Sequence, residues 1–255
     1  MYSWKNLRSC VRMGLTGHCA ENSLPDISDI IAAANTNLSS SLVYDDIRID
    51  GRRSADPCVT RGCQWPKSGD VVRVPFYISD EFNQRQRDVI LSVMMFFKNN
   101  TCIRFEPWES EWSFLFFFSG TGCWSYLGNI GQPQPISLQK NGCIRNGTIQ
   151  HEILHALGFH HEQNRSDRNK YVRILYRNIL EGREINFQRV ATNNLGTPYD
   201  YNSIMHYSKF AFSKNRRPTI RAKREPFVFG TATTMSVTDI KRVNRLYECC
   251  EKYQC

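Results

Sequence analysis

The sequence predicts an α+β fold that is tied together by disulfides. Residues 71–78 (VVRVPFYI) have the β-branched and aromatic composition of a strand, and apolar residues between positions 82 and 97 recur at helical spacing. The chain also has ten cysteines, an even number that is typical of proteins folded in an oxidising compartment. With 41% hydrophobic and 12% aromatic residues, the 255-residue chain can fill a core and is not expected to be disordered.

The individual elements follow from composition, spacing and capping residues. Asp80 is the expected cap of the helix that carries the apolar stripe, and Pro75 marks the end or the edge of the strand before it. The third helix stops at Gly158, because glycine readily takes the left-handed conformation of a helix end. Near the N-terminus, Asp26 or Ser28 caps a short helix. Helices are therefore predicted at residues 26–34, 80–97, 148–157 and 236–247, and strands at residues 71–78, 103–105 and 114–118.

A change in composition divides the chain near residue 53. The first part is polar, poor in aromatic residues and ends in the dibasic pair Arg52-Arg53. A dibasic pair before such a change is typical of a processing site, although an ordinary charged loop is the alternative. We therefore predict a propeptide at residues 1–53 and a single main domain at residues 54–255.

The net charge of +9 includes a basic run near the C-terminus. Such a run could attract nucleic acid, heparin-like sugars or acidic glycoproteins. A solvated basic face is the favoured interpretation, because no nucleic-acid-binding motif accompanies the run, and we expect no nucleic-acid partner. The run consists of Arg216, Arg217, Arg221, Lys223 and Arg224.

The cysteines predict secretion. A cysteine-based zinc site would need C-x-x-C pairs, and the sequence has none, so disulfides are the better interpretation. The first thirty residues contain no continuous apolar segment, so no signal peptide is visible, and we attribute this to an incomplete or mis-predicted 5′ end rather than to a cytosolic protein. No apolar run reaches membrane-spanning length. We expect a secreted, extracellular protein without a membrane span.

One motif carries chemistry. Residues 151–155 read H-E-x-x-H, and two histidines four apart on a helix share one face, so His151 and His155 can bind one metal ion. By composition this pentapeptide arises by chance in about one chain in a hundred of this length. The extension through Gly158 to His161 gives H-E-x-x-H-x-x-G-x-x-H and lowers that rate to about one in a hundred thousand.

The spacing of the motif has a physical reason. The third ligand must turn back toward the ion, and a residue with positive φ at Gly158 permits that reversal. Three neutral imidazoles bind one Zn²⁺ per subunit and leave a coordination position open for water. Zinc lowers the pKa of that water, and Glu152 is placed to take its proton. His160, His206 and His18 fall outside the motif and are expected to be structural or exposed.

With these residues established, the chain resembles the astacins, a family of metzincin zinc peptidases, and is most similar to the six-cysteine hatching-enzyme and nephrosin-like branch. The similarity covers most of residues 54–249. It is carried by the stretches HEILHALGFHHEQNRSDR, GCWSYLG, PYDYNSIMHY and LYEC at residues 151–168, 122–128, 198–207 and 246–249.

The resemblance implies a metzincin (zincin-like) architecture, in which a cleft separates two lobes. The upper lobe would hold a twisted sheet and the zinc-binding helix, and the irregular lower lobe would end with the helix at residues 236–247. The strand at residues 114–118 is expected to be an edge strand that pairs with extended substrate.

The resemblance also implies roles for single residues. Met205 would form an apolar floor beneath the zinc. Tyr207 would be a fifth zinc ligand that swings away and donates a hydrogen bond to the developing oxyanion, with a packed phenol as the alternative. Glu162 would receive the mature amino terminus. The latency aspartate of the astacin pro-segment lies in F-x-G-D, which here reads VYDD, so Asp46 is our choice and Asp45 stays open.

The disulfides of the family can be carried over by position. The pairing scheme implies Cys102–Cys249 and Cys123–Cys143, and the six-cysteine branch adds Cys58–Cys63. The other four cysteines have no counterpart in the scheme and would pair locally, as Cys10–Cys19 and Cys250–Cys255.

The sequence therefore favours a monomeric, secreted zinc endopeptidase that is made as a zymogen and cuts extracellular proteins, such as egg-envelope glycoproteins. A catalytically inactive secreted protein that keeps the fold for binding is the alternative, and a non-proteolytic zinc hydrolase is a third. The three histidines, Glu152 and Tyr207 are all present, which favours the enzyme.

Overall fold

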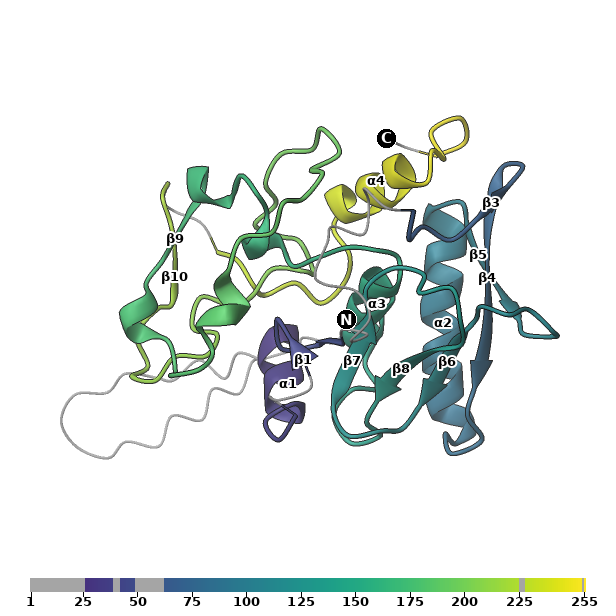
Figure 1. Ribbon diagram of the computed structural model, residues 1–255, viewed down its shortest axis with the longest axis horizontal. Helices are drawn as coiled ribbons and strands as arrows, with labels where there is room; N and C mark the ends of the chain where they lie inside the picture. The colour runs from purple at the N-terminus through teal and green to yellow at the C-terminus, as the bar shows by residue number, and fades with distance from the viewer. Residues whose placement is uncertain (1–25, 39–41, 49–61, 225–227, 254) are drawn as a thin grey trace, which may run out of the picture.

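The computed structural model describes residues 26–38, 42–48, 62–224, 228–253 and 255 (Figure 1). The expected α+β class is confirmed: a mixed sheet is combined with helices and with long irregular segments. The dibasic pair Arg52-Arg53, the pair Cys10–Cys19 and His18 lie outside the described residues, as does Cys58. None of the described helices is long and apolar enough to cross a membrane.

The main sheet has eight strands in the order β1-β2-β7-β8-β6-β4-β3, with β5 paired to β4. β4 runs parallel to β5 and β6, and β8 runs parallel to β6 and antiparallel to β7. Their bounds are Leu42–Val43 (β1), Ile47–Arg48 (β2), Lys67–Ser68 (β3), Val71–Ile78 (β4), Ile103–Pro107 (β5), Leu115–Phe118 (β6), Cys123–Tyr126 (β7) and Gln134–Leu138 (β8).

The prediction that residues 114–118 form an edge strand is wrong. The strand β6 lies between β4 and β8. Its residues are apolar at every position (LFFF), which is the pattern of an interior strand rather than of a half-exposed edge. At the other end of this part of the sheet, β7 has β8 as its main-domain partner on one side, and β2 of the N-terminal segment pairs with its other side in parallel.

The helix α2 (Gln84–Asn100) packs against the sheet and against α3 (Asn146–Ala156). Its predicted apolar stripe is confirmed, because Ile90 and Phe97 are fully buried. The predicted cap is wrong: Asn83, not Asp80, caps α2, because Asn83 and Gln86 form a reciprocal capping box.

The apolar side chains form two separate clusters, one in each lobe. The first lies between the sheet, α2 and α3, and the second contains Val172, Phe187 and Tyr207. The predicted helix at residues 236–247 forms as α4 (Val237–Leu246), with Ser236 as its cap, but it does not belong to the second cluster. Val243 and Leu246 of α4 belong to the first cluster, which also contains Met205.

The second lobe is largely irregular, as expected. Its strands are β9 (Val172–Ile174) and β10 (Ile220–Ala222), which pair antiparallel. In Figure 1 they lie at the end of the molecule opposite β3 and β4. Its short 3₁₀ helices span Glu162–Asn164, Arg168–Lys170, Tyr176–Asn178 and Glu184–Phe187.

The structure forms three disulfides among the described residues: Cys102–Cys249, Cys123–Cys143 and Cys250–Cys255. Cys63 is also disulfide-bonded. The helix α1 (Ile27–Ala34), capped by Asp26, precedes β1 and β2, so described parts of the predicted propeptide lie against the main domain.

Candidate active site

The helix α3 carries His151, Glu152 and His155 through the interior of the protein. Every residue from Gly147 to Ala156 is buried, so this helix has no solvent face. The two histidines lie one turn apart on one side. A backbone carbonyl fixes each ring: His151 Nδ1 lies 3.0 Å from the Ile204 oxygen, and His155 Nδ1 lies 2.7 Å from the Phe159 oxygen.

The chain reverses at Gly158 to bring in the third histidine. Gly158 has φ +103°, a conformation that residues with a side chain rarely adopt, and its N–H donates to the His155 carbonyl at 2.8 Å. After this turn the Glu162 N–H donates to the Met205 carbonyl at 2.9 Å, which ties the segment to the turn below the site. His161 is completely buried as a result.

The three imidazoles converge on one point. His151 Nε2 lies 3.1 Å from His155 Nε2 and 3.2 Å from His161 Nε2. The carboxylate of Asp46 closes the group, with distances of 3.0 Å to His151, 3.3 Å to His155 and 3.2 Å to His161. All four ligand atoms lie within 4.8 Å of one another.

This group fits a zinc ion. Nitrogen ligands about 2.0–2.1 Å from a tetrahedral ion would lie about 3.3 Å apart, close to the observed separations. Burial lowers the pKa of His161 to about 4, so its ring is neutral, as a metal ligand must be. Burial alone would raise the pKa of Asp46, but the imidazoles of His161 and His155 hold it well below its usual value.

Glu152 lies next to the ligands in an unusual environment. It is fully buried, and neither of its carboxylate oxygens has a hydrogen-bond partner among the described residues. Burial raises the pKa of Glu152 well above its usual value, and the negative charges of Asp46 and Asp45 add to the effect. Such an unpartnered buried carboxylate is costly for the fold, and its position suits a proton acceptor for water in the site.

The turn beneath the site is held by α4. Asp239 accepts hydrogen bonds from Ser203 Oγ at 2.6 Å and from the Ile204 N–H at 2.9 Å. Met205, which follows, is 2% exposed and belongs to the first apolar cluster. His206 lies outside the histidine group and contacts the Tyr199 hydroxyl at 2.7 Å.

Tyr207 lies beside the group, with its ring centroid 4.7 Å from that of His161. Its hydroxyl donates to the backbone oxygen of Tyr44 at 2.6 Å, so the N-terminal segment engages it. Burial raises the pKa of Tyr207 well above 10, which keeps the phenol protonated and able to donate.

The two candidate latency residues differ in position. Asp46 faces the histidines, whereas Asp45 is 3.7 Å from Arg183 and has φ +80°. Burial raises the pKa of Asp45 to about 8, with the neighbouring Asp46 adding. The structure therefore brings Asp46 alone to the metal-binding group.

The N-terminal segment also covers the edge of β7. The Ser125 N–H donates to the backbone oxygen of Asp46 at 3.0 Å. The side-chain amide of Asn35 bonds both backbone groups of Cys123, accepting from the N–H at 2.8 Å and donating to the oxygen at 2.7 Å. The main-chain groups that an added strand would use are thereby occupied.

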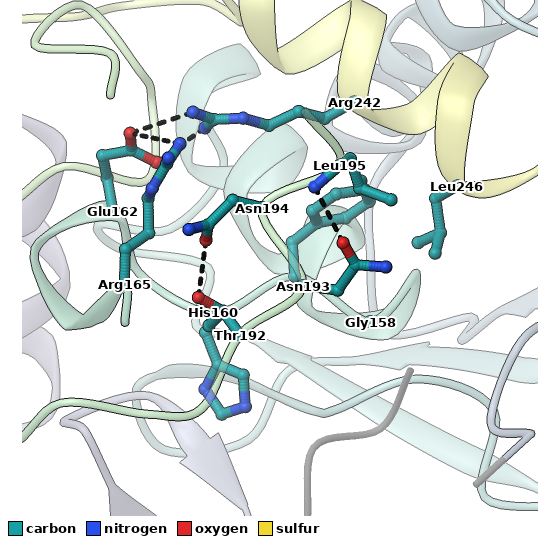
Figure 2. Close-up of a pocket in the computed structure, with 11 residues that line it drawn as sticks. Gly158, His160, Glu162, Arg165, Thr192, Asn193, Asn194, Leu195, Arg242 and Leu246 are labelled. Atoms are coloured by element: carbon teal, nitrogen blue, oxygen red, sulfur yellow. Dashed lines mark hydrogen bonds and ion pairs between the residues drawn. The ribbon is translucent and has the colours of Figure 1, made fainter. Parts of the chain in front are cut away.

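Glu162 contacts two arginines at the wall of a cavity (Figure 2). Arg242 donates to its two oxygens at 2.6 and 2.9 Å, and Arg165 donates at 3.3 Å. Burial raises the pKa of Glu162, and the positive charges of Arg242 and Arg165 oppose this. Gly158, His160, Asn194 and Leu195 also line this cavity, so His160 lies near the site without joining the histidine group.

Some of these residues were missed by sequence reasoning. Arg242, Asp239 and Asn35 act through partners that are 80, 36 and 88 positions away along the chain. A helical cap was the only signal at Asp239, which follows Ser236 by three positions, and no local pattern marks Asn35 or Arg242.

Comparison with known proteins agrees with this geometry. The family model for astacin, a family of peptidases, matches residues 60–248. Low choriolytic enzyme of Oryzias latipes is 42% identical over 233 residues, which cover 90% of this chain and 86% of that protein. Human meprin A subunit beta is 40% identical, over 88% of this chain and 31% of that protein.

A solved structure shows the same fold. The chain superposes on high choriolytic enzyme 1, a hatching-enzyme zinc protease from Oryzias latipes, with a TM-score of 0.73 and 44% identity, over 77% of this chain and all of that one. The predicted family is thus confirmed by sequence as well as by structure. The H-E-x-x-H helix, the reversal at Gly158 and the buried histidine group are the features of a chain that belongs to the astacin family of zinc metalloendopeptidases.

Proposed function

We propose that the protein is a secreted zinc endopeptidase that is made as a zymogen, with one Zn²⁺ bound by His151, His155 and His161. The observation that supports this best is the convergence of three buried imidazoles on one point that an aspartate of the N-terminal segment also reaches. Membership of the astacin family supports the peptidase activity. The disulfides support an oxidising, extracellular location.

The residues of the chain then divide the chemical work. When bound, zinc supplies a Lewis acid that polarises the scissile carbonyl and lowers the pKa of water. Glu152 accepts the proton of the attacking water and passes it to the leaving amine. Tyr207 donates its hydroxyl hydrogen bond to the oxyanion that develops on the carbonyl. The edge of β7 holds the substrate backbone by strand addition.

The N-terminal segment blocks each of these functions in the zymogen. Asp46 faces the histidines, the Tyr44 oxygen holds the Tyr207 hydroxyl, and β2 with Asn35 covers β7. We propose that removal of residues 1–53 frees the site of the mature domain, residues 54–255. The new ammonium group would then join Glu162 through the adjoining cavity.

The substrates are extracellular proteins or peptides, and we propose egg-envelope glycoproteins because three of the relatives are choriolytic enzymes. We further propose that the mature enzyme acts as a monomer, with neither nucleic acid nor a membrane as partner. A hatching-type role is distinct from peptidase activity itself, so the two need separate assays.

The decisive experiment compares the processed wild-type enzyme with Glu152→Gln. We expect casein cleavage by the wild type, its loss on chelation, and recovery with zinc. Glu152→Gln should lower kcat by about 10²–10⁴-fold, because it removes the general base. Zinc content, measured by elemental analysis, should stay at one ion per chain.

The same experiment separates the enzyme from an inactive binding protein. If the processed, zinc-loaded wild type cleaves no protein, the binding-protein hypothesis gains and the endopeptidase proposal is wrong. Full activity in Glu152→Gln would instead contradict the role of Glu152 while leaving the family assignment intact. Egg-envelope preparations serve as a second substrate, and resistance of this material alone would reject only the hatching-type role.

A further inference from the structure

A basic surface covers the part of the second lobe that is built from β9, the turn after it, β10 and the turn before it. Two segments, residues 173–178 and 214–221, run side by side there. Ile174 pairs with Ile220, and the Leu175 N–H donates to the Thr219 oxygen at 2.8 Å. The exposed cations of these segments, here called the basic surface, are Arg173, Arg177, Lys214, Arg216, Arg217 and Arg221.

Two of these cations oppose each other directly. Arg173 of β9 and Arg221 of β10 are register partners, and both are exposed. Their strand neighbours Val172, Ile220 and Ala222 are buried, so the two arginine side chains share the solvent side. Directly opposed like charges destabilise a strand pair, and the fold therefore carries a cost here that a bound anion would remove.

The turn next to this strand pair is fixed rather than loose. Asn178 is buried, and its Nδ2 donates to the backbone oxygen of Pro218 at 2.7 Å. The backbone oxygen of Asn178 accepts from the Lys214 N–H at 2.9 Å, and its Oδ1 accepts from Asn215 Nδ2 at 3.0 Å. Ser213 Oγ donates to the Arg217 oxygen at 2.7 Å. The turn is thus held beside Arg177, and its cations are displayed on a preorganised backbone.

The charge of the whole protein is concentrated in this lobe. Residues 169–224 contain 12 Lys and Arg but 3 Asp and Glu, a net charge of +9, while the rest of the chain contains 21 of each sign and is neutral. Across the part of the chain that the structure describes, none of the six cations of the basic surface forms an ion pair. The positive charges of the basic surface are therefore not neutralised by nearby acidic side chains among the described residues, and they create a positive potential there.

We infer that the basic surface binds a sulfated polysaccharide chain. The six cations come from the strand pair, from the 3₁₀ helix after β9 and from the turn before β10, so they are distributed over several elements, which suits a polymer better than a single small anion. Five of the six are arginines, whose planar forks bind tetrahedral oxyanions through two hydrogen bonds. Disulfides place the protein in an oxidising compartment, where sulfated glycans rather than nucleic acids are the abundant linear polyanions.

The basic surface is separate from the histidine group. The basic surface lies on β9, β10 and their turns, and none of its residues contacts the histidine group, so binding would hold the enzyme on an anionic matrix without changing the chemistry. A surface of this kind would raise the local concentration of enzyme on glycan-rich substrates.

The experiment measures binding of fluorescent heparin, a sulfated polysaccharide, to the full-length chain by anisotropy at low and at high salt. We expect binding that weakens steeply with salt, because counterions are released. Arg173→Gln/Arg221→Gln should weaken it at least about tenfold. The matched control is Arg85→Gln/Lys98→Gln, which removes the same charge from exposed positions of α2 and should leave binding within about twofold.

Several outcomes would overturn the inference. An equal loss in both double variants would show a response to net charge alone, and an unchanged affinity in Arg173→Gln/Arg221→Gln would remove the proposed contact. Polyglutamate or double-stranded DNA bound as tightly as heparin, or desulfated heparin bound equally well, would reject the sulfated class. Thermal unfolding checks folding: without polyanion, the Arg173/Arg221 variant should melt no lower than wild type, because a repulsion is removed. Arg216→Gln/Arg217→Gln provides a second variant on the turn, with the same expected loss of heparin binding.

Discussion

At the scale of single residues, the structure assigns the two aspartates of the N-terminal segment different surroundings. Asp46 faces three imidazoles, whereas Asp45 faces Arg183. We therefore expect Asp46→Ala to weaken the proposed latency, so that the unprocessed chain cleaves a small peptide substrate at a low rate while Tyr44 and β2 still cover part of the site. Asp45→Ala is the matched control and should stay latent, because the histidine group keeps Asp46. Activity assays on both unprocessed variants check this, and an inactive but folded, zinc-loaded Asp46→Ala protein would contradict it.

Tyr207 supplies a second prediction at this scale. Its hydroxyl donates to the Tyr44 oxygen and, under the proposed zymogen mechanism, would become available when the N-terminal segment is removed. Processed Tyr207→Phe should lower kcat by about 10²-fold with little change in KM, because one oxyanion donor is lost. Tyr199→Phe removes a buried hydroxyl that contacts His206 and serves as control. Steady-state kinetics decide the matter, and equal kcat losses in both variants would indicate a structural effect only.

Some residues of the site could be predicted from the sequence, and others could not. The proposed ligand set His151, His155 and His161 is marked by local spacing, because helix periodicity and a positive-φ glycine act within a few positions. The partners of Glu162 are not marked in this way. Arg242 lies on a helix 80 positions away from Glu162, and only tertiary packing brings the two side chains into contact. Local chemistry could thus be predicted, and long-range pairing could not.

At the scale of elements, the distinction between local patterns and long-range pairing also explains which predictions about strands were wrong. The apolar stripe of α2 and the position of α4 follow from local apolar spacing, and both were predicted correctly. The place of β6 in the sheet depends on which strands pair, and its apolar run alone does not reveal neighbours on both sides. Likewise β7 reads as a short CWSY segment in a loop-rich region, yet it is the strand that the N-terminal segment covers.

The docking of α1 should depend on pH through Asp29. This carboxylate accepts a hydrogen bond from Ser208 Oγ at 3.3 Å, and partial burial, with Asp26 adding, raises the pKa of Asp29 from 3.8 to about 6. The docked helix therefore binds a proton more tightly than the released helix. Docking is strongest below the released pKa, weakens as pH rises through about 6, and stays at the weaker level above it. Because water still reaches Asp29, the effect should be modest.

Hydrogen exchange of the α1 amides, corrected for intrinsic rates, measures this docking. Protection should be lower near pH 7 than near pH 5 in the wild type, and Asp29→Asn should remove most of the difference. Asp88→Asn, on the surface of α2, is the control and should leave it unchanged. Protection that rises with pH would show that the sign is wrong.

At the scale of the whole molecule, the catalytic group lies where the two apolar clusters meet. Met205 belongs to the first cluster and Tyr207, two residues later, belongs to the second. Asp239 of α4 holds the turn that carries both. The geometry of the site therefore depends on α4 staying in place against the first lobe.

The disulfide Cys102–Cys249 fixes the chain end that follows α4 to the end of α2, across a sequence separation of 147. Loop-closure entropy predicts that Cys102→Ser/Cys249→Ser lowers the free energy of unfolding by about 5 kcal/mol, against about 2 kcal/mol for the local pair Cys250→Ser/Cys255→Ser. Denaturant unfolding with both pairs of variants measures the difference. The long-range variant should also lose activity at a lower temperature, because α4 and the turn beneath the site loosen together. Equal destabilisation by the two pairs would mean that the closed loop is already ordered in the unfolded chain, or that α4 is held by packing alone.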